Sequence, residues 1–170
     1  METLNSPLEL GLRALVLLTT SYPRSFDIDR LVLMDYCLIH SGDLGGPPSV
    51  LPPVPNRGGE LGLKRSILEH GVQLMTRARM VDVEMTSEGI TYRASEEAAP
   101  FLRLVDSPLM PVLTDVAMWV ATEFGEQSIE EFREIIWTVA SQWNEQWNDD
   151  GFGDLVASAD SPVGDEGGLT

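Results

Sequence analysis

A helical stretch followed by two short alternating segments is the feature that most limits how this chain can fold. Residues 60–78 carry an apolar stripe at helical spacing, formed by Leu61, Leu68, Val72 and Met75. In "RARMVDVEMTSEGITYRAS", residues 77–95, apolar and polar residues then alternate on both sides of the turn Thr86-Ser87-Glu88-Gly89. A helix followed by a hairpin is the ending of a winged helix. The pattern therefore predicts a mainly α fold with one small β-hairpin.

Capping signals predict two helices before this region. Ser6-Pro7-Leu8-Glu9 is a capping box with proline at the first helical position, and it predicts a helix over 7–20. Asp27 and Asp29 suit the start of a second helix that reaches His40. These two helices and the helix–hairpin unit make a winged-helix-like domain, which we place at residues 4–106.

Further capping signals follow the hairpin. Ser95 is expected to open a helix, Ser107-Pro108 a second one that ends at about Phe124, and the capping box Ser128-Ile129-Glu130-Glu131 a third. We assign residues 107–148 to a C-terminal helical extension. Residues 149–170 are rich in Gly, Asp and Ser, and we expect them to form a disordered acidic tail.

The segment "SGDLGGPPSVLPPVPNRGG", residues 41–59, interrupts the winged-helix-like domain. It holds five prolines and five glycines, so it is expected to be a loop rather than a helix or strand. A loop of this length is either a mobile connector or a functional segment. In the second case the apolar residues Val50, Leu51 and Val54 would lie extended in a partner's groove.

Charge limits the partners of the chain. There are 11 basic and 27 acidic residues, a formal net charge of -16, so phosphate backbones repel the molecule as a whole. Residues 57–93 are the exception, with six basic side chains against five acidic ones. Four of the basic ones are candidates for weak phosphate contact within a larger assembly: Lys64, Arg65, Arg77 and Arg79. The simpler interpretation of each is a solvated helix face.

Sequence-specific DNA reading is not favoured by the loop at 41–59. A helix-turn-helix joins its two helices through a turn of about three or four residues, which fixes the second helix at the major groove. Here the same junction is the long Pro/Gly segment. The hairpin adds Arg93 but also three acidic residues, Asp82, Glu84 and Glu88. Nucleic acid is therefore expected to be bound only weakly, or through a complex.

Reactive side chains are scarce. Two histidines and one cysteine cannot assemble a Cys/His zinc site, and neither a GxxxxGK phosphate loop nor a GxSxG elbow is present. We expect no enzyme activity, no metal and no cofactor. Cys37 lies in an apolar stretch and is expected to be buried. No apolar run approaches the length of a spanning helix and no secretory signal is evident, so we expect a cytoplasmic protein that does not enter the membrane.

Four tryptophans, Trp119, Trp137, Trp143 and Trp147, lie on the predicted C-terminal helices. Aromatic side chains bury large areas, so a place in the core is the first interpretation. A contact surface is the alternative for Trp143 and Trp147, which are one helical turn apart and flanked by Asn144, Asn148 and Asp149. The partner-contact candidates are thus Asp43, Val50, Leu51, Val54, Trp143 and Trp147.

Three ordered blocks carry a family resemblance. "LNSPLELGLRALVLL", "FDIDRLVLMDYCLIHSGDLGGPPSVLPPVP" and "ELGLKRSILEHGVQLMTRARMVDVEMTSEGITYRASEEAAPFLRLV" are similar to the middle component of ABC-three-component systems, over about residues 4–124. That component is a small subunit encoded between a Rad50/SMC-type ABC ATPase and an effector, as in Lamassu-type antiphage defence. The matching positions are structural: Gly11, Arg13, Leu15, Asp35, Tyr36, His40, Asp43, Glu60, Leu61 and Arg65.

The resemblance implies a non-catalytic adaptor that binds the coiled-coil ATPase and couples nucleic-acid sensing to an effector, commonly a nuclease. This is our leading hypothesis. The alternative is a dimeric winged-helix transcription regulator, and a homodimer is compatible with either. A hydrolase or nuclease is the third class, which turnover of nucleic acid or nucleotide by the isolated chain would support.

Overall fold

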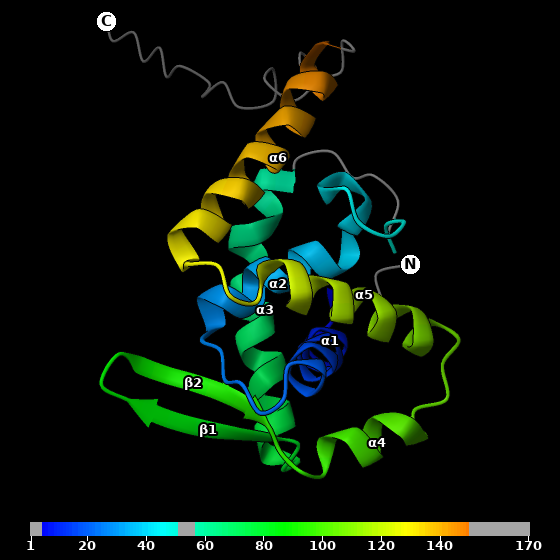
Figure 1. Ribbon diagram of the computed structural model, residues 1–170, viewed down its shortest axis with the longest axis vertical. Coiled ribbons are helices and arrows are strands. Elements are labelled where there is room, and N and C mark those ends of the chain that lie inside the picture. The colour runs from blue at the N-terminus through cyan, green and yellow to red at the C-terminus, as the bar shows by residue number, and fades with distance from the viewer. Residues whose placement is uncertain (1–4, 51–56, 150–170) are drawn as a thin grey trace, which may run out of the picture.

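The computed structural model describes residues 5–50 and 57–149 (Figure 1), with side chains described for 5–50 and 64–142. The elements are α1 (Pro7–Thr20), α2 (Ile28–Ile39), the 3-10 helix η2 (Ser41–Leu44), α3 (Arg57–Arg77), β1 (Val81–Thr86), β2 (Gly89–Ala94), α4 (Ala98–Leu104), α5 (Leu109–Phe124) and α6 (Ile129–Asp149). The prediction of a mainly α fold with one β-hairpin is confirmed. The predicted bounds of the first helix also match, because its capping box forms as expected around Ser6 and Glu9.

Two glycines let α1 and α3 cross at very short range. A Cβ atom added at Gly71 would lie 2.4 Å from the carbonyl oxygen of Pro7 and 2.6 Å from the amide nitrogen of Gly11. Both neighbours are backbone atoms, which cannot rotate away as a side chain could. The crossing therefore requires glycine on α3, and it brings the N-terminal half of α1 against the C-terminal half of the longer helix.

The core extends over the whole described chain. Buried side chains of α1, α2 and α3 form one hydrophobic cluster with Val81 and Ala94 of the hairpin and with side chains of α5 and α6, such as Val120 and Phe132. Figure 1 shows α5 lying across α1, and α6 running along the upper part of the molecule beside α3. The division into a domain and a C-terminal extension stays a prediction.

One residue of the α1–α2 connection pairs with the hairpin. Phe26 forms an isolated antiparallel bridge with Tyr92 of β2, and each residue donates its amide to the carbonyl of the other, at 2.9 and 2.8 Å. Phe26 is thus a one-residue third strand beside the hairpin. A short strand between the first two helices, paired with the hairpin, is compatible with a winged-helix-like arrangement.

Two arginines, Arg24 of the α1–α2 connection and Arg30 of α2, hold the corner between α5 and α6. The Arg30 guanidinium donates to the carbonyls of Phe124, at 3.1 Å, and of Gln127, and Arg24 donates to the carbonyl of Gly125. Cations at the C-terminal end of a helix satisfy its free carbonyls and favour its dipole. Burial is the main cause that lowers the pKa of Arg30 from its ordinary value.

The predicted start of the helix after the hairpin is wrong by two residues, because a helix capped by Ser95 would begin at Glu96, whereas α4 begins at Ala98. The Ser95 hydroxyl donates to the carbonyl of Arg79, and its oxygen accepts from the amide of Glu97, so this residue closes a turn before the helix. In the predicted 41–59 loop, residues 41–44 form η2 and residues from Arg57 belong to α3.

Candidate functional site

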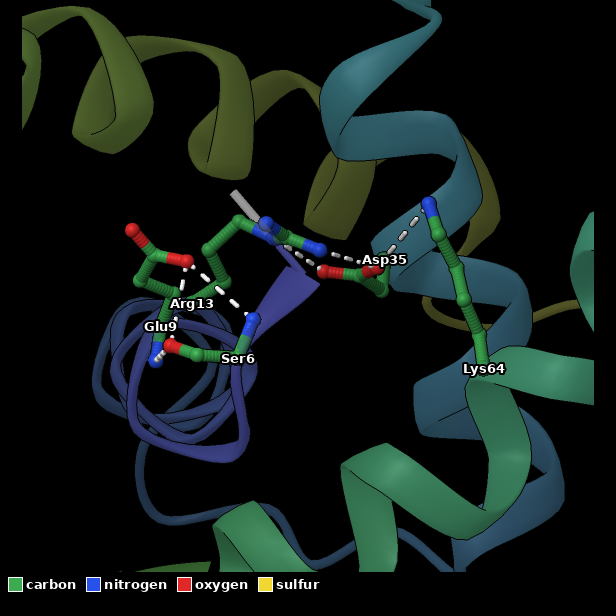
Figure 2. Close-up of polar contacts among 5 residues, drawn as sticks. All are labelled: Ser6, Glu9, Arg13, Asp35 and Lys64. Carbon is green, nitrogen blue, oxygen red and sulfur yellow. Dashed lines mark hydrogen bonds and ion pairs between the residues drawn. The ribbon is translucent and has the colours of Figure 1, made fainter. Parts of the chain in front are cut away.

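A buried ion cluster joins the first three helices (Figure 2). Arg13 of α1 donates two parallel hydrogen bonds to Asp35 of α2, from Nε to Oδ1 at 2.6 Å and from Nη2 to Oδ2 at 2.9 Å. The ammonium of Lys64, from α3, lies 3.9 Å from Oδ2 of the same carboxylate. All three side chains are at most 4% exposed. We call these three residues the ion cluster.

Local sequence explains why these charges lie inside. Asp35 interrupts the run "LVLMDYCLI" of α2, in which every residue is buried, so its carboxylate has no route to solvent. Arg13 is likewise surrounded by buried residues of α1. The start of α1 is fixed by the capping box, in which the Ser6 amide donates to Glu9 and the Glu9 amide donates to the Ser6 hydroxyl. Charges removed from water require close partners, and the bidentate pair provides them.

Further polar residues are buried at the C-terminal end of α2, the helix that carries Asp35. Tyr36 and His40 are fully buried, and their rings lie 4.8 Å apart between centroids. The next residue, Ser41, donates its hydroxyl to the carbonyl of Pro47, which holds the first part of the 41–59 loop against η2. Four positions of the family resemblance, Arg13, Asp35, Tyr36 and His40, are therefore buried in the interior.

Cys37 is buried next to these residues, as the sequence predicts. Burial, and then the negative charge of Asp35, raises the pKa of the Cys37 thiol well above its ordinary value. A thiol that stays protonated is a poor nucleophile. Its chemistry in the folded protein is therefore that of a small apolar side chain.

A small apolar groove of about 170 Å³ opens beside the ion cluster, between α1, α5 and the end of the described loop. Its lining includes Leu12, Arg13, Val50, Leu109 and Met110. Such a volume is below the range of roughly 300–1,000 Å³ that sites for small-molecule ligands occupy. Val50 is half-buried there and packs against the core.

Besides Val50, only Asp43 of the partner-contact candidates lies among the residues whose side chains the structure describes. Asp43 is half-buried in η2. Leu51 and Val54 lie outside the described residues, and Trp143 and Trp147 belong to the last turns of α6, where side chains are not described. A shared contact surface for these residues stays a prediction. Of the other two tryptophans, Trp119 packs against Phe124 and the core, whereas Trp137 is 63% exposed on α6.

The four phosphate-contact candidates differ in exposure. The expectation that Lys64 lies on a solvated face is wrong, because its side chain is buried toward Asp35. Arg65 is exposed and forms ion pairs with Asp29 of α2 and with Glu69 one turn along α3. Arg77 and Arg79 are exposed at the end of α3. Phosphate contact stays a prediction, and the buried side chain of Lys64 is not accessible to a phosphate in this conformation.

Within the part of the chain whose side chains are described, no group of three or more His, Cys, Asp or Glu side chains is placed to hold a metal ion. Among the described helices, none combines the length and the apolar character needed to cross a membrane.

The chain folds as a mainly α protein with one antiparallel hairpin, with which a winged-helix-like arrangement is compatible, and the buried ion cluster joins its first three α-helices. Residues 3–146 match the family described as ABC-three component (ABC-3C) system Middle Component 2, and the chain belongs to that family. The match confirms the resemblance seen in the sequence and extends beyond residue 124 to include most of α6. No curated protein and no solved structure matches the chain.

Proposed function

We propose that this chain is a non-catalytic adaptor subunit of a cytoplasmic antiphage defence complex of the Lamassu type. In this role it binds an SMC/Rad50-like ABC ATPase and links that ATPase to an effector, a nuclease. The observation that carries the proposal is the family match over residues 3–146, since the family's description makes the chain one component of a three-component system.

The described surface supports a role in protein contacts. Met85 of β1 and Leu104 of α4 are each 82% exposed, and Trp137 of α6 is also mostly exposed. Large apolar side chains in water add to affinity when a partner covers them. These three residues lie on elements at different sides of the helical body (Figure 1), which suits a subunit held by more than one neighbour.

Co-expression tests the proposal. The tagged chain is produced together with the ATPase and the effector encoded beside it, and the components retained after affinity purification are identified. We expect both components to be retained, and the isolated chain to turn over neither nucleotide nor nucleic acid. If the tagged chain retains neither component, or hydrolyses a substrate alone, the adaptor assignment fails.

The alternative of a dimeric winged-helix regulator rests on α3 being followed directly by the hairpin, with Arg77 and Arg79 exposed between them. Binding of the purified chain to duplex DNA at low salt, about 50 mM, separates the two functions. Specific nanomolar binding with a steep salt dependence would favour the regulator. The formal charge of -16 leads us to expect no such binding.

A further inference from the structure

The backbone hydrogen bonds of Tyr92 identify the free edge of the hairpin. Both the amide and the carbonyl of Tyr92 bond to Phe26, so neither is turned toward β1. Tyr92 and its cross-strand partner Val83 therefore form a pair without mutual hydrogen bonds. The amide and carbonyl of Val83 consequently point to the outer side of β1, and by the alternation of the strand so do those of Met85.

The outer side of β1 has no strand beside it among the residues that the structure describes, because the sheet consists of β1 and β2 with Phe26 on the β2 side. In Figure 1 the hairpin extends away from the helical body, with β2 nearer to the α1–α2 connection and β1 farther from it. Such an edge offers ready-made hydrogen-bonding positions to an incoming strand, and proteins usually shield it.

The side chains on the two faces of β1 differ in character. On one face lie Val83 and Met85, 44% and 82% exposed, next to Ile90 of β2, which is 47% exposed. The other face carries Asp82 and Glu84. Glu84 is paired with Arg93 at 2.8 Å, whereas Asp82 is exposed and forms no ion pair within the described part of the chain.

We propose that β1 binds an extended segment of another protein, in which apolar residues alternate with basic ones, as an additional strand. The apolar residues of that segment cover Val83 and Met85, and the basic ones lie against Asp82 and Glu84. Main-chain bonds to an edge strand supply affinity, and side chains on alternate faces supply specificity. This inference rests on the proposed adaptor function, since it gives one component of the complex its docking site.

A second copy of this chain fits the edge less well. Antiparallel pairing of two β1 strands centred on Val83 places Asp82 of each copy opposite Glu84 of the other, and pairing centred on Glu84 places that residue opposite itself. Like charges directly opposite each other destabilise a sheet. The formal charge of -16 on each copy adds to the repulsion. A basic segment of a different protein meets neither cost.

Two variants of β1 and one matched control test the proposal in the complete co-expressed system. Val83→Pro removes an amide that points outward, so the bonds between β1 and β2 remain. Met85→Lys replaces the most exposed apolar side chain of the strand and repels a basic segment. Met118→Lys is the control, because Met118 is also an exposed methionine, 58% exposed, but lies on α5. Thermal unfolding of each variant shows whether the fold is intact.

We expect Val83→Pro to weaken retention of one component about tenfold, since one lost hydrogen bond amounts to roughly that factor. Met85→Lys should weaken it by a similar factor, because it removes an apolar contact and places a positive charge against a basic segment. Met118→Lys is expected to retain that component as the wild type does. Hydrogen exchange of the wild-type complex should show new protection at the amides of Val83 and Met85. If exchange at these two amides is unchanged in the complex, or if both β1 variants bind as the wild type does, the edge is not the docking site.

Two further results would separate a failure of the proposed function from a failure of the proposed docking site. If the wild type retains no component, the proposed function fails, and a synthetic peptide of alternating valine and lysine then tests the edge alone. That peptide should shift the amide resonances of Val83 and Met85, whereas an alternating valine–glutamate peptide should not; equal responses, or none, overturn the inference. A dimer of the isolated chain that Val83→Pro dissociates would assign the edge to a second copy and also overturn it.

Discussion

Replacing Asp35 by leucine should be the most damaging single change in the ion cluster. Asp35 is the only carboxylate of the cluster, and it lies within 2.6–2.9 Å of Arg13 and 3.9 Å of Lys64. Its removal leaves two buried cations without the carboxylate that they share. Breaking a buried ion pair by removing one partner costs about 3–5 kcal/mol.

The expected loss is a large fraction of the unfolding free energy of a protein of this size, about 5–15 kcal/mol. At about 2–4 °C per kcal/mol, it corresponds to a fall of roughly 6–20 °C in the melting temperature. Urea and thermal unfolding of the purified chain measure both quantities. Asp29→Leu is the matched control: Asp29 is 46% exposed and pairs with Arg65 at the surface, where such a pair contributes about 0–1 kcal/mol.

The reasoning also predicts how the losses combine. Replacing all three residues, by Arg13→Met, Asp35→Leu and Lys64→Met together, removes every charge of the cluster and should restore stability above that of Asp35→Leu alone. A loss for Asp35→Leu no larger than that for Asp29→Leu would refute the account. A triple variant less stable than Asp35→Leu would show that the charges stabilise the fold in their own right.

Three further predictions concern other parts of the fold. Gly71→Ala should cost about 1–3 kcal/mol or more in unfolding free energy, because its methyl group would overlap backbone atoms of α1, whereas alanine at an exposed helical position such as Gln73 should change little. The pKa of the Cys37 thiol is raised in the folded state, so its contribution to the free energy of unfolding should be fully present below the ordinary thiol pKa. That contribution should then fall by about 1.4 kcal/mol per pH unit as the pH rises toward the folded pKa. Urea unfolding from pH 7 to about 10 should therefore show a shallower decline in Cys37→Ala than in the wild type, and equal slopes would contradict this. Arg30→Met should speed hydrogen exchange in residues 121–128 while leaving the hairpin unchanged; a uniform increase over the chain would instead mean global destabilisation.

Much of the fold could be predicted because its signals are local. The capping box at Ser6 and Glu9 involves residues three apart, and it forms as expected. The turn at 86–89 and the alternation on both sides of it likewise fix the register of the hairpin, in which Thr86 faces Gly89. The start of α4 was not predicted correctly, because Ser95 does not act as a helix cap. Its hydroxyl donates to the carbonyl of Arg79, before the hairpin, and Ser95 closes a turn that precedes the helix.

The ion cluster could have been found from periodicity but was not. Lys64 lies four residues before Leu68, on the same helical face as the apolar stripe of α3, and Asp35 stands alone in an apolar run of α2. A lone cation on one apolar face and a lone anion on another are a signal for a buried pair. Arg24 and Arg30 gave no such signal, because their acceptors are backbone carbonyls of the α5–α6 corner, which only the folded structure brings near.

The free edge of β1 shows why a docking surface is harder to predict than a fold. Alternation predicts both strands of the hairpin equally, and it does not say which of them will have a neighbour. That is decided by Phe26, a residue with no strand pattern around it, which bonds to Tyr92 and so covers the β2 side. The edge that remains open is therefore a consequence of long-range pairing. The sequence of the strand, through Asp82 and Glu84, indicates only that a bound segment should be basic. Which edge of the hairpin binds that segment follows from the structure, so binding of a basic segment at β1 tests the structure.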